Sequence, residues 1–231
     1  MTMLRYVLLV MMLLPLQSCA FYYSAAPIEA WVIDAETGKP LEGVIVTANW
    51  QLKGGLEGGN DFGQMMVMEA VTDKSGRFYF PAWGPKRNVS DGHIKQDGPQ
   101  LLLFKSGYRY LALFNETRVT DRPGPFLKSD WNGKTIKLER FKETDLQTQY
   151  KNLLNFSKGV DSFATWHIDP CQWTNLPTAV NKMMQERKKL EAQGVRSVMD
   201  RTLDRQLLEG ESYFIKQCGS TAQTFIEGTK K

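Results

Sequence analysis

From residue 28 to residue 138 the chain alternates short, β-rich apolar stretches with clusters of turn residues. In the stretch 44–48, Val44, Val46 and Ala48 fall on one face of a strand, and Ile45 and Thr47 fall on the other. Patterns of this kind predict seven short strands, at residues 28–33, 44–48, 66–72, 77–80, 101–108, 110–114 and 135–138. Because turn signals separate them, we expect a seven-stranded antiparallel β-sandwich.

The segments that connect these strands differ in character. Strands 66–72 and 77–80 are predicted to form a hairpin around the tight turn Asp73–Gly76, which has glycine at its left-handed position. The glycine-rich stretch 52–63 lacks the preceding strand and following helix of a phosphate-binding loop, so we interpret it as a flexible excursion. Residues 84–99 are expected to form a polar loop.

Beyond about Arg140 the period of the apolar positions changes to the helical one. The first predicted helix has Leu146, Tyr150, Leu153 and Leu154 on one face. The second begins near Pro177, with Asn175 as a candidate cap, and ends at Gly194; its apolar stripe is Val180, Met183, Met184 and Leu190. A third helix is expected around residues 198–207. The predicted fold class is therefore α+β, with a β-sandwich over 28–140 and a small α-helical C-terminal region over 141–231 that docks on it.

Residues 1–18 have the pattern of a targeting segment. Arg5 precedes the apolar run 6–14, which is shorter than the roughly 20 residues of a membrane-spanning helix. The sequence Leu16-Gln17-Ser18-Cys19 resembles the lipobox of bacterial lipoproteins. The resemblance implies cleavage between Ser18 and Cys19, acylation of Cys19 (palmitate is a typical chain), and, because alanine follows the cysteine, sorting to the outer membrane of a Gram-negative cell. Residues 19–27 would then be a tether between membrane and sandwich. Ordinary secretory cleavage after Ala20 and a coincidental cysteine are the alternatives.

The remaining two cysteines support an extracytoplasmic location. If Cys19 carries lipid, Cys171 and Cys218 form an even pair in an oxidising compartment, which predicts a disulfide. Two free, buried thiols are the alternative.

Three separated blocks of the β-rich region, "DAETGKPLEGVIVTA", "TDKSGRFYF" and "LLFKSGY", resemble the carboxypeptidase regulatory-like domain. The matching positions are Asp34, Thr37, Gly38, Pro40, Leu41, Gly43, Val44, Val46, Ala48, Thr72, Asp73, Gly76, Phe78, Phe80, Lys105, Gly107 and Tyr108. The resemblance covers about half the chain and implies a transthyretin-like β-sandwich. That family is an accessory module of peptidases, transporter plugs and surface proteins, so the likeness defines a fold better than a function. The insert at 51–64 departs from the compact form of the pattern.

Composition and motifs exclude several kinds of chemistry. The net charge of +4 comes without a long basic run, which disfavours nucleic acid as a partner. There is no HExxH pattern, no GxSxG motif, no Walker loop and no dinucleotide fingerprint, and we expect neither a metal nor a cofactor. His167, Asp169 and Cys171 form the best catalytic candidate, but Cys171 has an obvious oxidation partner.

The sequence therefore predicts a non-catalytic, lipid-anchored envelope protein that binds or helps to assemble another envelope component. Its partner could be a protein, a peptide or a glycan. The alternative is a small envelope hydrolase that uses a carboxylate or the Cys/His group. Trp83 and Tyr108 are candidate contact residues for the partner, with a place in the core as the alternative for each.

Overall fold

The computed structural model describes residues 21–54, 60–94, 98–116, 124–141, 146–161 and 172–195. In these residues the chain forms eleven strands and two α-helices, so the fold is α+β as predicted. The strands belong to three sheets. The predicted third helix at 198–207 lies outside the described residues.

The largest sheet, which we call the central sheet, has five strands. They are β3 (Ile45–Gly54), β4 (Asn60–Val71), β7 (His93–Ile94), β8 (Gln100–Phe104) and β9 (Leu111–Leu113). Their order is β4-β3-β8-β9, with β7 paired to the far end of β3, and all pairs are antiparallel.

Two three-stranded sheets lie on one side of the central sheet. The β1 sheet contains β1 (Tyr22–Ala25), β6 (Trp83–Arg87) and β10 (Phe126–Leu127) in the order β10-β1-β6. The β2 sheet contains β2 (Ile28–Asp34), β5 (Arg77–Phe80) and β11 (Thr135–Leu138) in the order β11-β2-β5. The pairs β1–β10 and β2–β11 are parallel. The prediction of a wholly antiparallel sandwich is therefore wrong for these two pairs.

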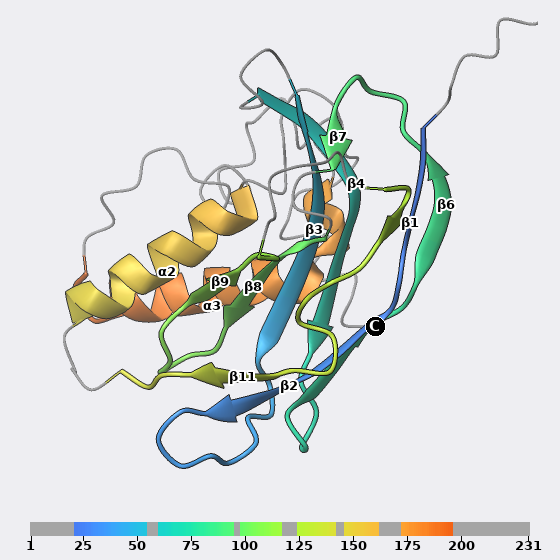
Figure 1. Cartoon of the computed structure of the whole chain (residues 1–231). Coiled ribbons are helices and arrows are strands. Elements are labelled where there is room, and N and C mark those ends of the chain that lie inside the picture. Colours follow the sequence, from blue (N-terminus) through green and yellow to red (C-terminus); the bar gives the residue numbers. More distant parts are fainter. Residues whose placement is uncertain are drawn as a thin grey trace, which may run out of the picture.

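Helices α2 (Leu146–Asp161) and α3 (Pro177–Ala192) cover the opposite face of the central sheet, with a short 3-10 helix, η1 (Gln172–Asn175), before α3. Figure 1 shows the helices on one side of the central strands and β1 and β6 on the other. No helix of the described residues is both long and apolar enough to cross a bilayer.

The alternation in β3 explains this three-layer arrangement. Val46, Ala48 and Trp50 belong to the core shared with the β1 and β2 sheets, whereas Ile45 belongs to a second core shared with the helices. Strand β8 divides in the same way, because Leu101 and Leu103 face the sheets and Leu102 faces the helices. Strands of one sheet that alternate in this manner can bury both faces. The predicted docking of the helical region on the sandwich is thus confirmed for α2 and α3.

The predicted apolar stripe of α3 is confirmed, since Val180, Met183, Met184 and Leu190 are all buried. Helix α3 also ends just before Gly194, as predicted. The amide of Gly194 donates to the Glu191 carbonyl at 3.0 Å, and the amide of Val195 donates to the Leu190 carbonyl at 3.1 Å. Gly194 has a φ of 87°, which completes a Schellman motif. The predicted cap was wrong, because the N-cap residue is Leu176, which has no side-chain oxygen, and Asn175 belongs to η1.

Three segments are more ordered than predicted. Residues 22–25, placed in the tether, form β1, because Tyr23 and Ala25 are buried against the sandwich core. The excursion at 52–63 is largely the continuation of β3 and the start of β4, which pair as far as Gly54 and Asn60. The polar loop at 84–99 contributes most of β6 and all of β7. These additions raise the number of strands above the predicted seven.

The expected hairpin between residues 66 and 80 is also wrong. Strand β4 pairs with β3, and β5 pairs with β2, so the turn crosses between two sheets. Thr72 holds this crossing, since its hydroxyl donates to the Leu41 carbonyl at 2.5 Å and accepts from the Val44 amide at 2.8 Å. These bonds fix the end of β4 to the segment between β2 and β3, whose flanking strands are the partners of β5 and β4.

Candidate functional site

Most of the site residues predicted from the sequence lie outside the described residues. These are Ser18 and Cys19 of the lipobox, and His167, Asp169, Cys171 and Cys218. The two candidate contact residues are described, and both are buried, with exposed fractions of 8% for Trp83 and 6% for Tyr108. Trp83 packs edge-on against Trp50, with ring centres 5.4 Å apart. Both belong to the core of the sandwich, which is the alternative that the sequence left open for each.

Tyr108 belongs to a hydrogen-bonded cluster around Asp34, the last residue of β2, which is 1% exposed. One carboxylate oxygen of Asp34 accepts from the amides of Glu36 at 3.0 Å and Thr37 at 2.9 Å. The other accepts from the Tyr108 hydroxyl at 2.9 Å and from Arg140 Nε at 2.7 Å. Arg140 also lies over the Tyr108 ring, 5.4 Å from its centre. The cluster joins the beginning, middle and end of the β-rich region.

The electrostatics of this cluster keep Asp34 ionised. The hydrogen bond from Arg140, followed by the bond from the Thr37 amide, holds the pKa of Asp34 well below its usual range, although burial acts in the opposite direction. Burial and the hydrogen bond to Asp34 raise the pKa of Tyr108. A general acid or base needs a pKa near the working pH, and these shifts move both groups away from neutrality. The arrangement is suited to holding the segments that carry Asp34, Tyr108 and Arg140 together.

A second polar cluster lies where the central sheet meets the helices. Ser106, just after β8, donates to Glu186 of α3 at 2.7 Å, and Lys182 pairs with the same carboxylate oxygen at 3.0 Å. Lys105 donates to the Glu42 carbonyl at 2.7 Å. Asn152 of α2 accepts from the Tyr110 amide at 2.6 Å and donates to the Tyr108 carbonyl at 3.1 Å. The bonds of Ser106 and Asn152 join the helices to the segment between β8 and β9, whereas the Lys182–Glu186 pair lies within α3.

The junction contains a small hollow lined by Lys105, Ser106, Asn152, Glu186 and neighbouring residues. Its volume of about 20 Å³ holds about one water molecule. Burial and the nearby Lys182 lower the pKa of Lys105. Burial also acts to raise the pKa of Glu186, but the bonds from Ser106 and Lys182 outweigh it and the pKa lies below its usual value. Glu186 is therefore a weak base toward Ser106, and the hollow has no room for a substrate.

A third contact, at the start of α3, was not visible in the sequence. Glu69 of β4 accepts hydrogen bonds from the amides of Thr178 at 2.8 Å and Ala179 at 3.0 Å. A carboxylate here satisfies two free helix amides and complements the positive end of the helix dipole. In the part of the chain that the structure describes, no three His, Cys, Asp or Glu residues lie together as a metal site would require.

Comparisons with known proteins add little to this picture. No family model matches the chain, and no curated protein matches it. Among solved structures, 3-chlorocatechol 1,2-dioxygenase from Rhodococcus opacus 1CP is similar over 55% of this chain and 64% of its own, with 16% identity and a TM-score of 0.30. Hydroxyquinol 1,2-dioxygenase from Pseudomonas putida DLL-E4 is similar over 52% and 57%, with 16% identity and a TM-score of 0.28.

The major pilin SpaD from Corynebacterium diphtheriae gives a TM-score of 0.25 at 13% identity, over 50% of this chain and 32% of the pilin. The chain thus spans less than two thirds of the length of each of these three proteins.

Proposed function

We propose that the chain is a lipid-anchored envelope protein, sorted to the outer membrane, that has no catalytic activity and binds or helps to assemble another envelope component. The anchor rests on the lipobox-like sequence that ends at Cys19. The binding role rests on the resemblance of residues 28–140 to a carboxypeptidase regulatory-like module. We assign the sandwich to the transthyretin-like class on the same resemblance.

The observation that supports a non-catalytic role is the way the polar side chains are used. In the described residues, Asp34 is surrounded by four hydrogen-bond donors, and Glu186 is held by Ser106 and Lys182. Both carboxylates are engaged in joining layers of the fold, and the hollow beside Glu186 holds about one water molecule. A hydrolase would need such groups to converge on a cleft large enough for its substrate.

The outer face of the β2 sheet is the surface that fits a protein partner best. On edge strand β5, Tyr79 is 46% exposed and the Arg77 guanidinium lies 5.7 Å from its ring centre. Arg77 also pairs with Glu29 of β2. Tyrosine and arginine are enriched at the energetic centres of interfaces, and an edge strand can accept an extended segment through its backbone. This surface replaces Trp83 and Tyr108 as the candidate binding site.

Crosslinking in intact cells tests the binding role. A photoreactive amino acid at Tyr79 of the full chain should give a discrete crosslinked species. The same group at Lys188, which is exposed on α3, should not give that species. Tyr79→Ser in a chain that carries a crosslinker at Trp31 of β2 should weaken the product. Equal products from positions 79 and 188 would argue against this binding face.

Activity assays test the non-catalytic role separately. The purified full chain should not hydrolyse peptide, ester or glycan substrates, with or without added zinc. Turnover that is lost in His167→Ala or Cys171→Ala, while the circular dichroism spectrum is unchanged, would favour the alternative of a small envelope hydrolase.

A further inference from the structure

The β1 sheet presents an aromatic and basic outer face. Tyr23, Ala25 and Leu127 point into the sandwich core and are buried. The residues that alternate with these point outward. The strand register pairs Tyr22 with Arg87 and Ser24 with Phe126, so these four residues share the outer face. Tyr22 is 49% exposed and Phe126 is 58% exposed, which is unusual for large rings on an ordered sheet.

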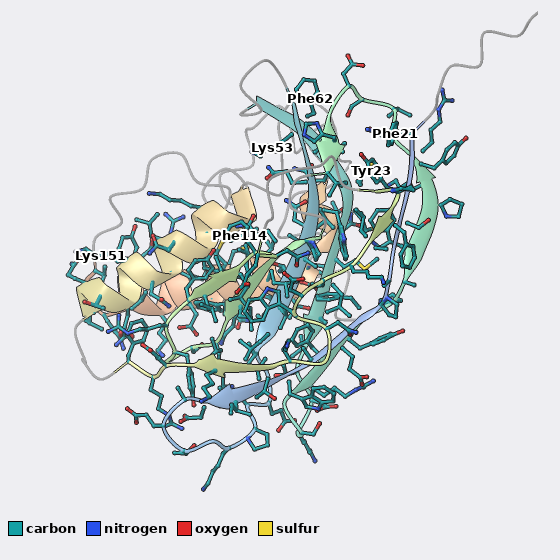
Figure 2. All side chains as sticks on the ribbon, in the orientation of Figure 1. Phe21, Tyr23, Lys53, Phe62, Phe114 and Lys151 are labelled. Atoms are coloured by element: carbon teal, nitrogen blue, oxygen red, sulfur yellow. The ribbon has the colours of Figure 1, made fainter. Side chains whose placement is uncertain are left out.

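Two further exposed apolar residues, Phe21 and Val89, lie at one end of this sheet, where the Phe21 ring is on the side of Tyr23, with ring centres 5.9 Å apart. Phe21, immediately before β1, is 48% exposed, and Val89, just after β6, is 85% exposed. The two segments are joined, because the Asn88 amide donates to the Phe21 carbonyl at 2.7 Å. Figure 2 shows Phe21 at the start of β1, near the end of β6.

The charge of this face has one sign. Residues 21–26, 83–89 and 124–128, which contain the three strands, include no Asp or Glu, and Arg87 and Lys128 lie on this face. Lys86 lies opposite the inward-facing Tyr23, and its ammonium donates to the Met65 carbonyl. Arg87 stands opposite Tyr22, and the ammonium of Lys128 lies 5.9 Å from the centre of the Phe126 ring. Exposed rings flanked by Lys and Arg are the composition that binds the interface of an anionic bilayer.

The position of the proposed anchor supports the same surface. Only Ala20 separates Cys19 from Phe21. Two residues of extended chain span at most about 7 Å, so acyl chains on Cys19 would hold Phe21 at the membrane interface. The helices lie on the other side of the molecule from β1 and β6 (Figure 1) and would then point away from the bilayer.

We propose that the outer face of the β1 sheet docks on anionic phospholipid headgroups. Tyr22 and Phe126 lie at the interface, and Arg87 and Lys128 contact lipid phosphates. This inference rests on the proposed acylation of Cys19, because the acyl chains bring the face to the membrane. Docking of the β1 sheet would fix the orientation of the chain on the membrane. In this orientation the β2 sheet and the helices remain accessible to a partner.

Spin-label accessibility in reconstituted vesicles tests the orientation. The acylated full chain carries a nitroxide on a cysteine in place of Phe126 or, as a matched control, in place of Tyr79, an exposed aromatic residue on the β2 sheet. Vesicles contain phosphatidylethanolamine with or without phosphatidylglycerol. The label at 126 should lose accessibility to a water-soluble nickel reagent when phosphatidylglycerol is present, whereas the label at 79 should not. The double variant Arg87→Gln/Lys128→Gln should restore the accessibility at 126.

The outcomes distinguish the proposed lipid anchor from the proposed docking of the β1 sheet. A chain that is acylated and bound to vesicles, but whose label at 126 stays as accessible as the label at 79, overturns the docked face and leaves the anchor intact. A chain that is not acylated overturns the anchor and the docked face together. Protection at 126 without vesicles would show that a protein surface covers this face instead, which also overturns the proposal.

Discussion

At the scale of single residues, Asp34 shows how one carboxylate connects distant parts of the chain. Its partners Tyr108 and Arg140 lie 74 and 106 residues away in the sequence. Asp34, Thr37 and Tyr108 could be singled out from the sequence as positions of the resemblance, but the part of Arg140 could not. A pairing over 106 residues leaves no local signal, because only the completed sheets bring the two side chains together.

We predict that Asp34→Asn lowers the free energy of unfolding, since Arg140 loses its charged partner. The pKa of Asp34 lies below its usual value of 3.8 in the folded chain, so its stabilising contribution is complete above that pH and falls as the pH is lowered. The difference between wild type and Asp34→Asn in urea unfolding should therefore narrow from pH 7 to pH 3. Tyr108→Phe, which removes one hydrogen bond, should cost about 1 kcal/mol at pH 7. A difference between wild type and Asp34→Asn that stays constant with pH would contradict this account.

At the scale of secondary structure, the elements that could be predicted have complete local patterns. Strands β5 and β11 have the predicted bounds, because each alternates fully and is flanked by turn residues. Strand β1 could not be predicted, since it is only four residues long and both of its partners, β6 and β10, lie far away in the sequence. The beginning of α3 at Pro177 was predicted correctly, but its cap could not be, because Glu69 of β4 accepts from the first helix amides.

We predict that Glu69→Ala destabilises the protein by about 1 kcal/mol, as the loss of a helix cap does. Glu69→Gln should cost less, because its amide oxygen can still accept from one helix amide. Urea unfolding followed by circular dichroism measures both changes. The control is Glu191→Ala, which breaks a surface pair with Arg187 and should cost no more than about 0.5 kcal/mol. Equal effects of Glu69→Ala and Glu191→Ala would show that the contact with α3 does not act as a cap.

At the scale of the whole molecule, the helices share a core with the central sheet. Phe156 of α2 is fully buried and stacks on Phe104 of β8, with ring centres 4.5 Å apart. Leu102 and Ile45 belong to the same core. The sequence places the border between sandwich and helices near residue 140, yet the two parts bury apolar surface against each other. We therefore expect the described regions to unfold as one cooperative unit.

We predict that Phe156→Ala lowers the free energy of unfolding by about 3–5 kcal/mol. Tryptophan fluorescence, to which Trp50 and Trp83 of the sandwich core contribute, and helical circular dichroism should change at the same urea concentration in wild type. Val89→Ala, at an exposed position, should change stability by no more than about 0.5 kcal/mol. Loss of the helical signal at a lower urea concentration than the fluorescence change would contradict a single unit.

The disulfide Cys171–Cys218 remains a prediction from the sequence. Closing this loop would stabilise the chain by about 4 kcal/mol in the chain-entropy description. Peptide mapping of protein taken from the envelope under non-reducing conditions should recover the two cysteines in one linked peptide pair. Recovery of both as free thiols would refute it.

The lipid anchor underlies both the proposed location and the docked face of the β1 sheet, so the mature N-terminus is the most direct test. Mass spectrometry of the protein extracted from its native envelope should show a chain that begins at Cys19 and carries acyl chains. The Cys19→Ala variant should remain an unprocessed or unacylated precursor. A mature chain that begins at Phe21 and carries no lipid would contradict the account.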